Sequence, residues 1–172
     1  MTNLDLQNGS RVAIIGGGPA GSFFAYFLLK YAQRRGVQPD VTIFDAKDFL
    51  LKGPRGCNLC AGVISETLSQ RLRSEGIPLP EQRIVHRVGG YCLHLDHSRL
   101  LLTGEGEEGG SIATVFRGNG PRYSKYSGTI SFDDFLLTLA LDYGASLKLQ
   151  PVREISRPAG EGGPVHPVSY TH

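Results

Sequence analysis

The sequence of 172 residues contains no tryptophan, one methionine and three cysteines, and its formal net charge at pH 7 is only +2. This nearly balanced charge lacks the basic excess that nucleic-acid-binding domains carry, so no nucleic-acid partner is predicted. The three cysteines cannot all pair with one another, and the first ten residues carry Asp5 and no basic residue, unlike the basic start of a secretory signal. We therefore expect reduced thiols and a cytoplasmic protein.

An uninterrupted apolar span is also missing. Residues 12–29 carry no charge, which is close to the length that crosses a bilayer. The middle of this stretch, however, is Gly16-Gly17-Gly18-Pro19, and such a cluster would break a spanning helix. The stretch is therefore interpreted as two elements joined by a turn, and no transmembrane segment is predicted.

Glycine is abundant: 23 of the 172 residues are glycine, nearly twice the average of about 7%. Hydrophobic residues make up 40% and charged residues 20% of the chain, which excludes a disordered protein and allows a buried core. The length favours one domain.

The first 45 residues predict a strand, a helix and a second strand. Arg11–Ile15 and Val41–Asp45 are short apolar runs, typical of parallel strands that are buried on both faces. Pro19–Arg35 predicts a helix that is apolar around most of its circumference and therefore largely buried. This order is a βαβ unit, so the predicted fold class is α/β, with a Rossmann-like arrangement of strands and helix.

The remaining elements are less regular. Apolar residues recur at helical spacing in residues 131–143, and Ser65 is a suitable N-cap for a second helix over 65–75. Additional strands, several of them antiparallel, are predicted at residues 84–95 with a kink at Gly89-Gly90, and at 99–103, 112–117 and 145–149. We expect residues 1–156 to form the folded domain, in which a second region begins around 77–128. Residues 157–172, which contain three prolines and three glycines, are expected to form a flexible tail.

The strongest functional signal is the G-x-G-x-x-G pattern of residues 16–21, which follows a strand and opens a helix. In such a pattern Gly16 permits the tight turn, Gly18 lets the backbone approach a pyrophosphate, and Gly21 lets the helix pack closely on the strand. Backbone N–H groups at the start of the helix would then hold the phosphates.

An acidic residue follows the second strand. Asp45 lies 24 residues beyond Gly21, where a carboxylate can accept hydrogen bonds from both hydroxyls of a ribose and disfavours the 2′-phosphate of NADP. Residues 1–156 are therefore predicted to be an FAD/NAD(P)-binding domain that includes the beginning of a substrate region around 77–128. The predicted cofactor-binding residues are Gly16, Gly17, Gly18, Pro19, Ala20, Gly21, Asp45 and Ala46.

The glycine pattern alone does not separate FAD from NAD, but a family resemblance does. The segments VAIIGGGPAGSFFAYFL and VTIFDA resemble the flavin-binding start of the para-hydroxybenzoate hydroxylase-like flavoproteins. The segments GPRGCNLCAGVIS and ISFDDFLLTLALDYGASLKL resemble, more narrowly, the geranylgeranyl reductase branch. The family's F-D-x-x-L-x-x-x-A-x-x-x-G-A helix is matched by Phe132, Asp133, Leu136, Ala140, Gly144 and Ala145.

This resemblance covers about half of the chain and implies an FAD-dependent oxidoreductase. Family members bind FAD non-covalently, take electrons from a reduced donor, and reduce isoprenoid double bonds or hydroxylate or halogenate aromatic substrates. The chain departs from the family in carrying Thr129 where an arginine is common, and it is less than half of the usual length, which suggests an incomplete enzyme. The alternative is a non-catalytic module that uses the same βαβ unit to hold NAD or FAD. No catalytic residue is assigned.

The pair Cys57 and Cys60 leaves three interpretations open. The resemblance implies a loop that faces the flavin or the substrate, the pair could be ordinary buried thiols, and it could be a redox pair or half of a zinc site. A zinc site would need further ligands such as Cys92, His94 or His97, and this spacing is not that of the common zinc sites.

Two weaker signals accompany the cysteines. Alternation in residues 91–96 places Cys92, His94 and Asp96 on one face of a strand, which we interpret as the solvent face of an antiparallel sheet rather than as a pocket wall. Lys52 and Arg55 could meet a phosphate, although basic loop residues are usually just solvated.

Overall fold

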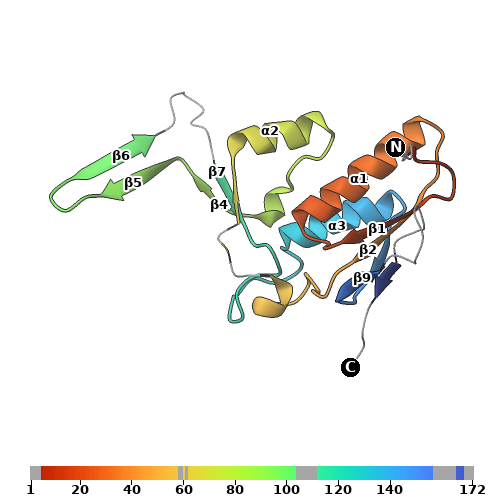
Figure 1. The fold of residues 1–172 in the computed structure, drawn as a ribbon. Coiled ribbons are helices and arrows are strands. Elements are labelled where there is room, and N and C mark those ends of the chain that lie inside the picture. The colour runs from red at the N-terminus through yellow and green to blue at the C-terminus, as the bar shows by residue number, and fades with distance from the viewer. Residues whose placement is uncertain (1–4, 58–59, 61, 104–111, 157–165, 169–172) are drawn as a thin grey trace. The chain divides into compact units, whose positions relative to one another are not determined.

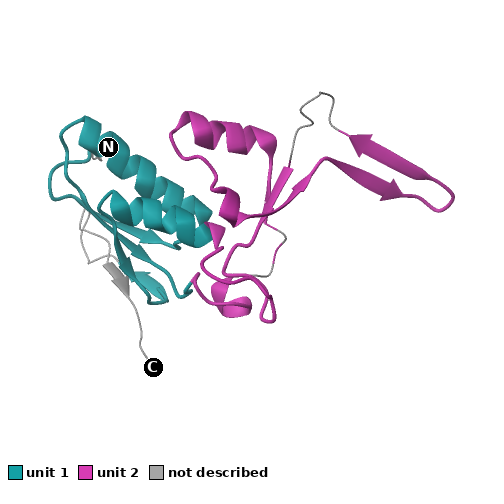
Figure 2. Ribbon diagram, turned by 180° about the vertical axis from the view of Figure 1, so that it is seen from behind, with its two compact units in different colours: residues 1–48, 133–172 teal, residues 49–132 magenta. Residues whose placement is uncertain are grey.

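A computed structural model describes residues 5–57, 60, 62–103, 112–156 and 166–168. The chain divides into two compact units, shown in teal and magenta in Figure 2. The first unit consists of residues 1–48 together with 133–172, and the second consists of residues 49–132.

The first unit is built on a parallel sheet of three strands in the order β1-β2-β8. These strands are β1 (Arg11–Ile15), β2 (Asp40–Phe44) and β8 (Ser146–Lys148). Helix α1 (Pro19–Arg34) connects β1 to its parallel neighbour β2, so the predicted βαβ unit is confirmed (Figure 1).

Helices α1 and α3 (Phe132–Asp142) lie side by side in Figures 1 and 2. The aromatic rings of Tyr26 on α1 and Tyr143 after α3 meet edge to face, with centroids 4.7 Å apart. The apolar core of this unit is formed mainly by Ile14, Ala25, Tyr26, Leu29, Ala32, Val41, Ile43, Leu136, Leu137 and Ala140.

The burial of β1 and α1 is more one-sided than the sequence predicts. Ile14 is 7% exposed, but its neighbour Ile15 is 50% exposed, because successive side chains of a strand point to opposite faces of the sheet. On α1 the buried residues form a single stripe at helical spacing, and Phe24 on another side is 55% exposed. The expectation of a strand buried on both faces and a largely buried helix is therefore wrong for these residues.

The second unit contains an antiparallel sheet in the order β3-β7-β4 and a separate two-stranded hairpin, β5-β6. The strands of the sheet are β3 (Val63–Ile64), β7 (Ile112–Val115) and β4 (Ile84–Val88), and those of the hairpin are β5 (Gly90–His94) and β6 (Arg99–Thr103). The predicted kink at Gly89-Gly90 is the point where pairing passes from β7 to β6, so one predicted strand is two.

Helix α2 (Glu66–Ser74) begins as the sequence predicts, because the Ser65 hydroxyl accepts a hydrogen bond from the Leu68 N–H over 3.2 Å. Two short 3₁₀ helices, η1 (Pro54–Gly56) and η2 (Glu81–Arg83), and strand β3 were not predicted. Elements this short carry too few residues for a periodic signal.

After β8 the first unit continues into β9 (Glu154–Ser156), which pairs antiparallel with β10 (His166–Val168). Three residues of the predicted tail are thus in a strand, and the rest of 157–172 lies outside the described residues. In the part of the chain that the structure describes, no helix combines the length and the apolar character needed to cross a membrane.

Candidate functional site

The glycine turn leaves the carboxyl end of β1 with a backbone that only glycine adopts easily. Gly16 has φ +102°, and its N–H donates to the carbonyl of Phe44 over 2.8 Å, which extends the β1-β2 ladder by one bond. The predicted tight turn is therefore present at the residue that the sequence indicates.

Gly21 is required by close packing rather than by its φ angle. A Cβ atom at this position would lie 1.8 Å from the Gly16 carbonyl oxygen and 3.2 Å from the Ile14 side chain. The first turn of α1 can therefore sit against the end of β1 only if residue 21 has no side chain.

The N-terminus of α1 has neither a side-chain cap nor an acidic residue in its first turn. Gly18 is the N-cap, and Pro19 occupies the first helical position, where its missing N–H costs nothing. The first N–H inside the helix ladder is that of Ser22, which donates to Gly18 over 2.9 Å. The N–H groups of Ala20 and Gly21 precede it, so this helix end presents donors and a positive partial charge to an anion.

Asp45 follows β2 and reaches the glycine turn. Its Oδ2 accepts a hydrogen bond from the Gly17 N–H over 2.6 Å, and its Oδ1 accepts one from the Lys47 N–H over 2.7 Å. The side chain is half-buried, and the next residue, Ala46, is exposed. The structure thus brings Asp45 directly beside the predicted phosphate loop, at the shared carboxyl edge of β1 and β2.

One further residue of this turn was not predicted. The Ser22 hydroxyl, which is fully buried, donates to the Gly17 carbonyl over 2.7 Å and ties the turn to the first turn of α1. A serine directly after the last glycine of the pattern is the only signal in the sequence, and hydrophobic periodicity does not detect it.

The cysteines are thiols in the structure, with Cys57 half-buried and Cys60 and Cys92 exposed. The interpretation as ordinary buried thiols is therefore wrong for Cys60, whose Sγ lies 3.7 Å from Nη1 of Arg117. Among the described residues, no three or more His, Cys, Asp or Glu side chains come together as metal ligands would.

Lys52 has a structural role. Its ammonium donates to the carbonyls of Ser124 and Tyr126 over 2.9 and 3.0 Å, so two of its three donors hold a loop of the second unit. Arg55 in η1 is exposed, in agreement with a solvated basic residue.

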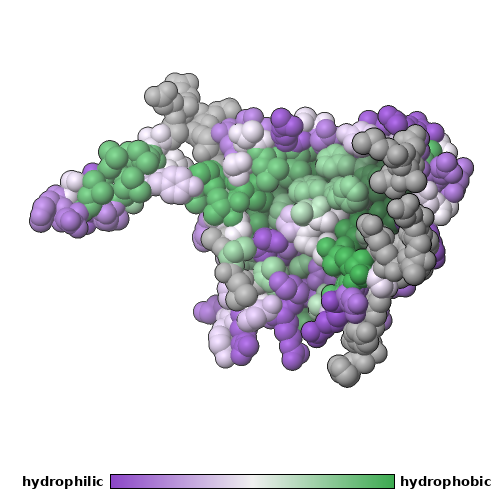
Figure 3. Space-filling model, viewed as in Figure 1, coloured by the Kyte–Doolittle hydropathy of each residue, from purple (hydrophilic) through white to green (hydrophobic). Residues whose placement is uncertain are grey.

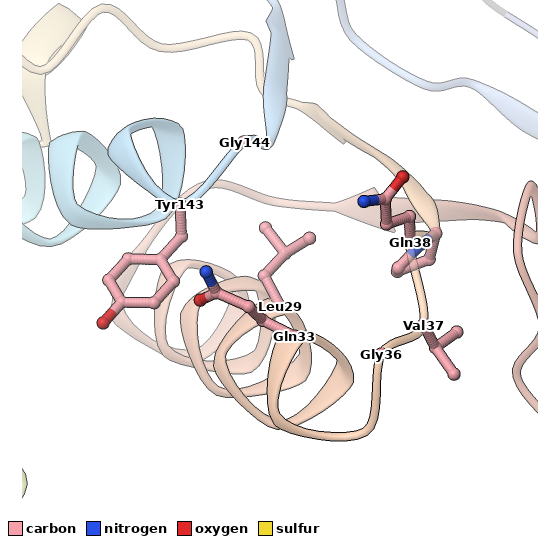
Figure 4. Close-up of a pocket in the computed structure, with 8 residues that line it drawn as sticks. Leu29, Gln33, Gly36, Val37, Gln38, Tyr143 and Gly144 are labelled. Atoms are coloured by element: carbon pink, nitrogen blue, oxygen red, sulfur yellow. The ribbon is translucent and has the colours of Figure 1, made fainter.

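A cavity of about 300 Å³ in the first unit lies at the other end of α1 (Figure 4). It is lined by Leu29, Gln33, Gly36, Val37, Gln38, Pro39, Tyr143 and Gly144. A helix of 16 residues is roughly 24 Å long, so this cavity is too far from the glycine turn to share a phosphate with it.

No protein-family model matches this chain, and no curated protein sequence does either. Solved structures do match. The peptidyl tryptophan dihydroxylase QhpG, essential for tryptophylquinone cofactor biogenesis, superposes with a TM-score of 0.55 at 20% identity, over 92% of this chain and 30% of that one. The flavin-dependent brominase Bmp2 gives 0.59 at 18% identity, over 95% of this chain and 36% of that one. Xcc4156, a flavin-dependent halogenase from Xanthomonas campestris, superposes with a TM-score of 0.59 at 14% identity, over 92% of this chain and 38% of that one.

The chain spans about a third of the length of each of these enzymes. At such identities the similarity concerns the fold, which is a mixed α/β fold with a parallel sheet and additional antiparallel strands, as the sequence predicts. Over the part that it covers, the chain therefore shares the fold of these three proteins.

Proposed function

We propose that this chain binds FAD, as the cofactor-binding part of a flavin-dependent oxidoreductase. The observation that carries the proposal is the contact between the Asp45 carboxylate and the Gly17 N–H, 2.6 Å long, at the uncapped N-terminus of α1. This contact places the helix N-terminus, which can bind an anion, next to a carboxylate, which can bind the hydroxyls of a ribose. The adenosine diphosphate half of FAD contains both a pyrophosphate and a ribose.

The residues of the turn fit such a ligand. The absence of a side chain at Gly21 keeps the first turn of α1 tight against β1, and no acidic residue in that turn repels a phosphate. In the proposed complex, the N–H groups of Ala20 and Gly21 hold the pyrophosphate and Asp45 orients the adenosine ribose. Bound FAD would supply the redox chemistry, by passing electrons from a reduced donor to a substrate or to oxygen.

The choice of FAD over NADP rests on the charge of Asp45. A carboxylate at the end of the second strand repels a 2′-phosphate, which NADP carries and FAD lacks. The choice of FAD over NAD is supported by the matched flavoprotein segments and by the flavin-dependent enzymes that share the fold.

For the reaction of the whole enzyme, two classes are proposed. The resemblance of the cysteine loop and of α3 to the geranylgeranyl reductase branch favours reduction of an isoprenoid double bond. The names of the structural neighbours, a tryptophan dihydroxylase, a brominase and a halogenase, favour oxidation of an aromatic substrate instead. Consumption of a reduced donor by the FAD-loaded protein, measured with an isoprenoid and with an aromatic compound, would separate the two.

The first experiment is a visible absorption spectrum of the purified protein before and after addition of FAD and desalting, followed by titrations with FAD, NAD, NADP and ADP. We expect a retained yellow chromophore that denaturation releases. A protein that binds NAD and ADP but not FAD would be the non-catalytic nucleotide module, and a protein that binds none of the four would overturn the site itself.

The matched variants are Asp45→Ala, directly after β2, and Asp40→Ala, at the first residue of β2. Loss of a hydrogen-bonded carboxylate is expected to weaken ADP and FAD binding by roughly 10- to 100-fold, or about 1.5–3 kcal/mol. Asp40, which is exposed at the far end of β2, should leave the affinity unchanged. Equal affinities of wild type and Asp45→Ala would remove Asp45 from the site.

A further inference from the structure

The β5-β6 hairpin of the second unit carries a continuous apolar face. Residues that lie opposite each other in an antiparallel pair point to the same face, and the register pairs Tyr91 with Leu102 and Leu93 with Leu100. Beyond the strand, Leu95 pairs with Ser98 around a two-residue turn and extends this face.

All five apolar residues of this face are exposed. The exposed fractions are 50% for Tyr91, 45% for Leu93, 59% for Leu95, 49% for Leu100 and 46% for Leu102. Figure 3 shows the hydrophobic residues of the hairpin open to solvent, on the projecting ribbon that Figure 1 labels β5 and β6.

The opposite face is mostly polar, so the hairpin is amphipathic. It carries Cys92, His94, Arg99 and Thr103, with Leu101 as its only large apolar residue. The polar face is therefore suited to contact with water, and the apolar face is suited to contact with another apolar surface.

A two-stranded ribbon also needs a partner for its own stability. Isolated hairpins are marginally stable in water, and among the described residues β5 and β6 pair only with each other. A layer packed on the apolar face would supply the missing burial, at the spacing of about 10 Å that stacked sheets adopt.

We propose that the apolar face of the β5-β6 hairpin is a dimerisation surface, on which the same face of a second copy of this chain docks. Five half-exposed side chains present on the order of 500 Å² per copy, which is at the upper end for a monomer. Two such faces together bury on the order of 1,000 Å², the lower bound for a specific interface.

The chemistry of the face fits a second copy. Between residues 90 and 103 this face carries no charged side chain, so two copies meet without like-charge repulsion. A two-fold contact places the same residues on both sides, and a row of leucines with one tyrosine is complementary to itself. The absence of cations on this face argues against nucleic acid or an anionic lipid surface.

The test is the mass of the protein in solution, measured by sedimentation velocity over a hundredfold range of concentration. Wild type is expected to be a dimer that dissociates on dilution. Leu93→Lys and Leu102→Lys place a charge in the contact and should weaken the dimer at least tenfold. Leu101→Lys is the matched control, because Leu101 is 67% exposed on the opposite face, and it should leave the dimer intact.

Two additions keep the test decisive if a lysine variant fails to fold. Leu102→Thr removes apolar surface while keeping a strand-forming residue. Hydrogen exchange on the wild type needs no variant, and protection of the β5 and β6 amides should rise with protein concentration in step with the dimer fraction. A monomer at all concentrations, equal effects of Leu93→Lys and Leu101→Lys, or a different protein seated on a monomer would each overturn the proposal.

Discussion

The parallel sheet of the first unit and the β5-β6 hairpin of the second unit have similar apolar strands but a different burial. In β2, Val41 and Ile43 are 1% and 0% exposed, and α1 packs against this strand. In the hairpin, Leu93 and Leu100 face each other across the ribbon and remain about half exposed. Apolar alternation therefore predicts that a segment is a strand, and the neighbouring layer decides whether the strand is buried.

The two units also contain glycines and serines in comparable structural positions. Gly21 in the first unit and Gly62 in the second are both positions where a Cβ would collide with a backbone carbonyl, and Ser22 and Ser65 each hold a helix start. Substitutions at these pairs compare how much stability each unit loses when the same kind of contact is disrupted.

The largest effect is expected from Gly21→Ala. The added Cβ would lie 1.8 Å from the Gly16 carbonyl oxygen, so the glycine turn and α1 must move apart. We expect a loss of about 3 kcal/mol in the free energy of unfolding, together with loss of ADP binding. Urea unfolding followed by far-ultraviolet circular dichroism measures the first, since the chain has no tryptophan. Gly17→Ala, where the nearest atom is 3.3 Å away, should destabilise less, and equal losses would contradict the packing argument.

Gly62→Ala should be the counterpart in the second unit. Its Cβ would lie 2.0 Å from the Val115 carbonyl, and its φ of +59° disfavours any side chain. We expect the second unit to lose about 2 kcal/mol of stability. In a hydrogen-exchange experiment the amides of β3 and β7 should lose protection, while those of β1 and β2 should keep theirs. Gly89→Ala is the control, because nothing lies within 4 Å of that position. If β1 and β2 lose protection to the same extent, the two units are not independent.

Ser22→Ala tests a buried hydroxyl. The variant leaves the Gly17 carbonyl without its 2.7 Å partner, which should cost about 1.5 kcal/mol and weaken ADP binding because the turn is no longer tied to α1. Thermal unfolding and calorimetric titration with ADP measure the two effects. An unchanged melting temperature would show that water replaces the hydroxyl.

Ser65→Ala is the exposed counterpart of that substitution. The hydroxyl caps α2 through a 3.2 Å bond to the Leu68 N–H, and its loss should cost about 0.7 kcal/mol without affecting nucleotide binding. Ser65→Asp retains a capping oxygen and should restore the stability. A cost above that of Ser22→Ala would reverse the order expected for buried and exposed bonds.

The smallest effect is expected on the pH dependence of stability, from Tyr26→Phe above pH 10. Burial raises the pKa of Tyr26 above its usual value of 10.0, and a hydrogen bond with Tyr143 raises it further. The unfolded chain therefore releases this proton first, so the contribution is complete below pH 10 and is lost as the pH rises through the folded pKa. Unfolding free energies of Tyr26→Phe should fall less steeply above pH 10 than those of wild type. Tyr123→Phe, at a side chain that is 90% exposed, should follow wild type.

Much of the first unit could be predicted because its signals are local. The strand at Arg11–Ile15, the helix that begins at Pro19 and the acid at Asp45 each depend on a few adjacent residues. Their approach in space follows from the parallel pairing of β1 and β2, which a βαβ unit imposes. The Ser22 bond could not be predicted, because it depends on the angle at which α1 leaves the turn.

The second unit was harder to predict because its constraints come from distant residues. Cys57 and Cys60 lie in a loop whose neighbours, such as Arg117, are more than 50 residues away in the chain. Lys52 is held by carbonyls that lie 72 and 74 residues further on. No periodic pattern encodes such contacts, so only α2 and the strands from β4 to β7 were predicted there.

The hydrogen bonds of Asp45 have a consequence for affinity. A carboxylate offers about four acceptor positions, and the N–H groups of Gly17 and Lys47 occupy one on each oxygen. The side chain is thus fixed in one rotamer before any ligand arrives, while the remaining positions stay available to a vicinal diol. Binding of a ribose would therefore not have to immobilise the Asp45 side chain. The entropic cost of immobilising a side chain, about 0.5–1.5 kcal/mol, would already be included in the free energy of folding.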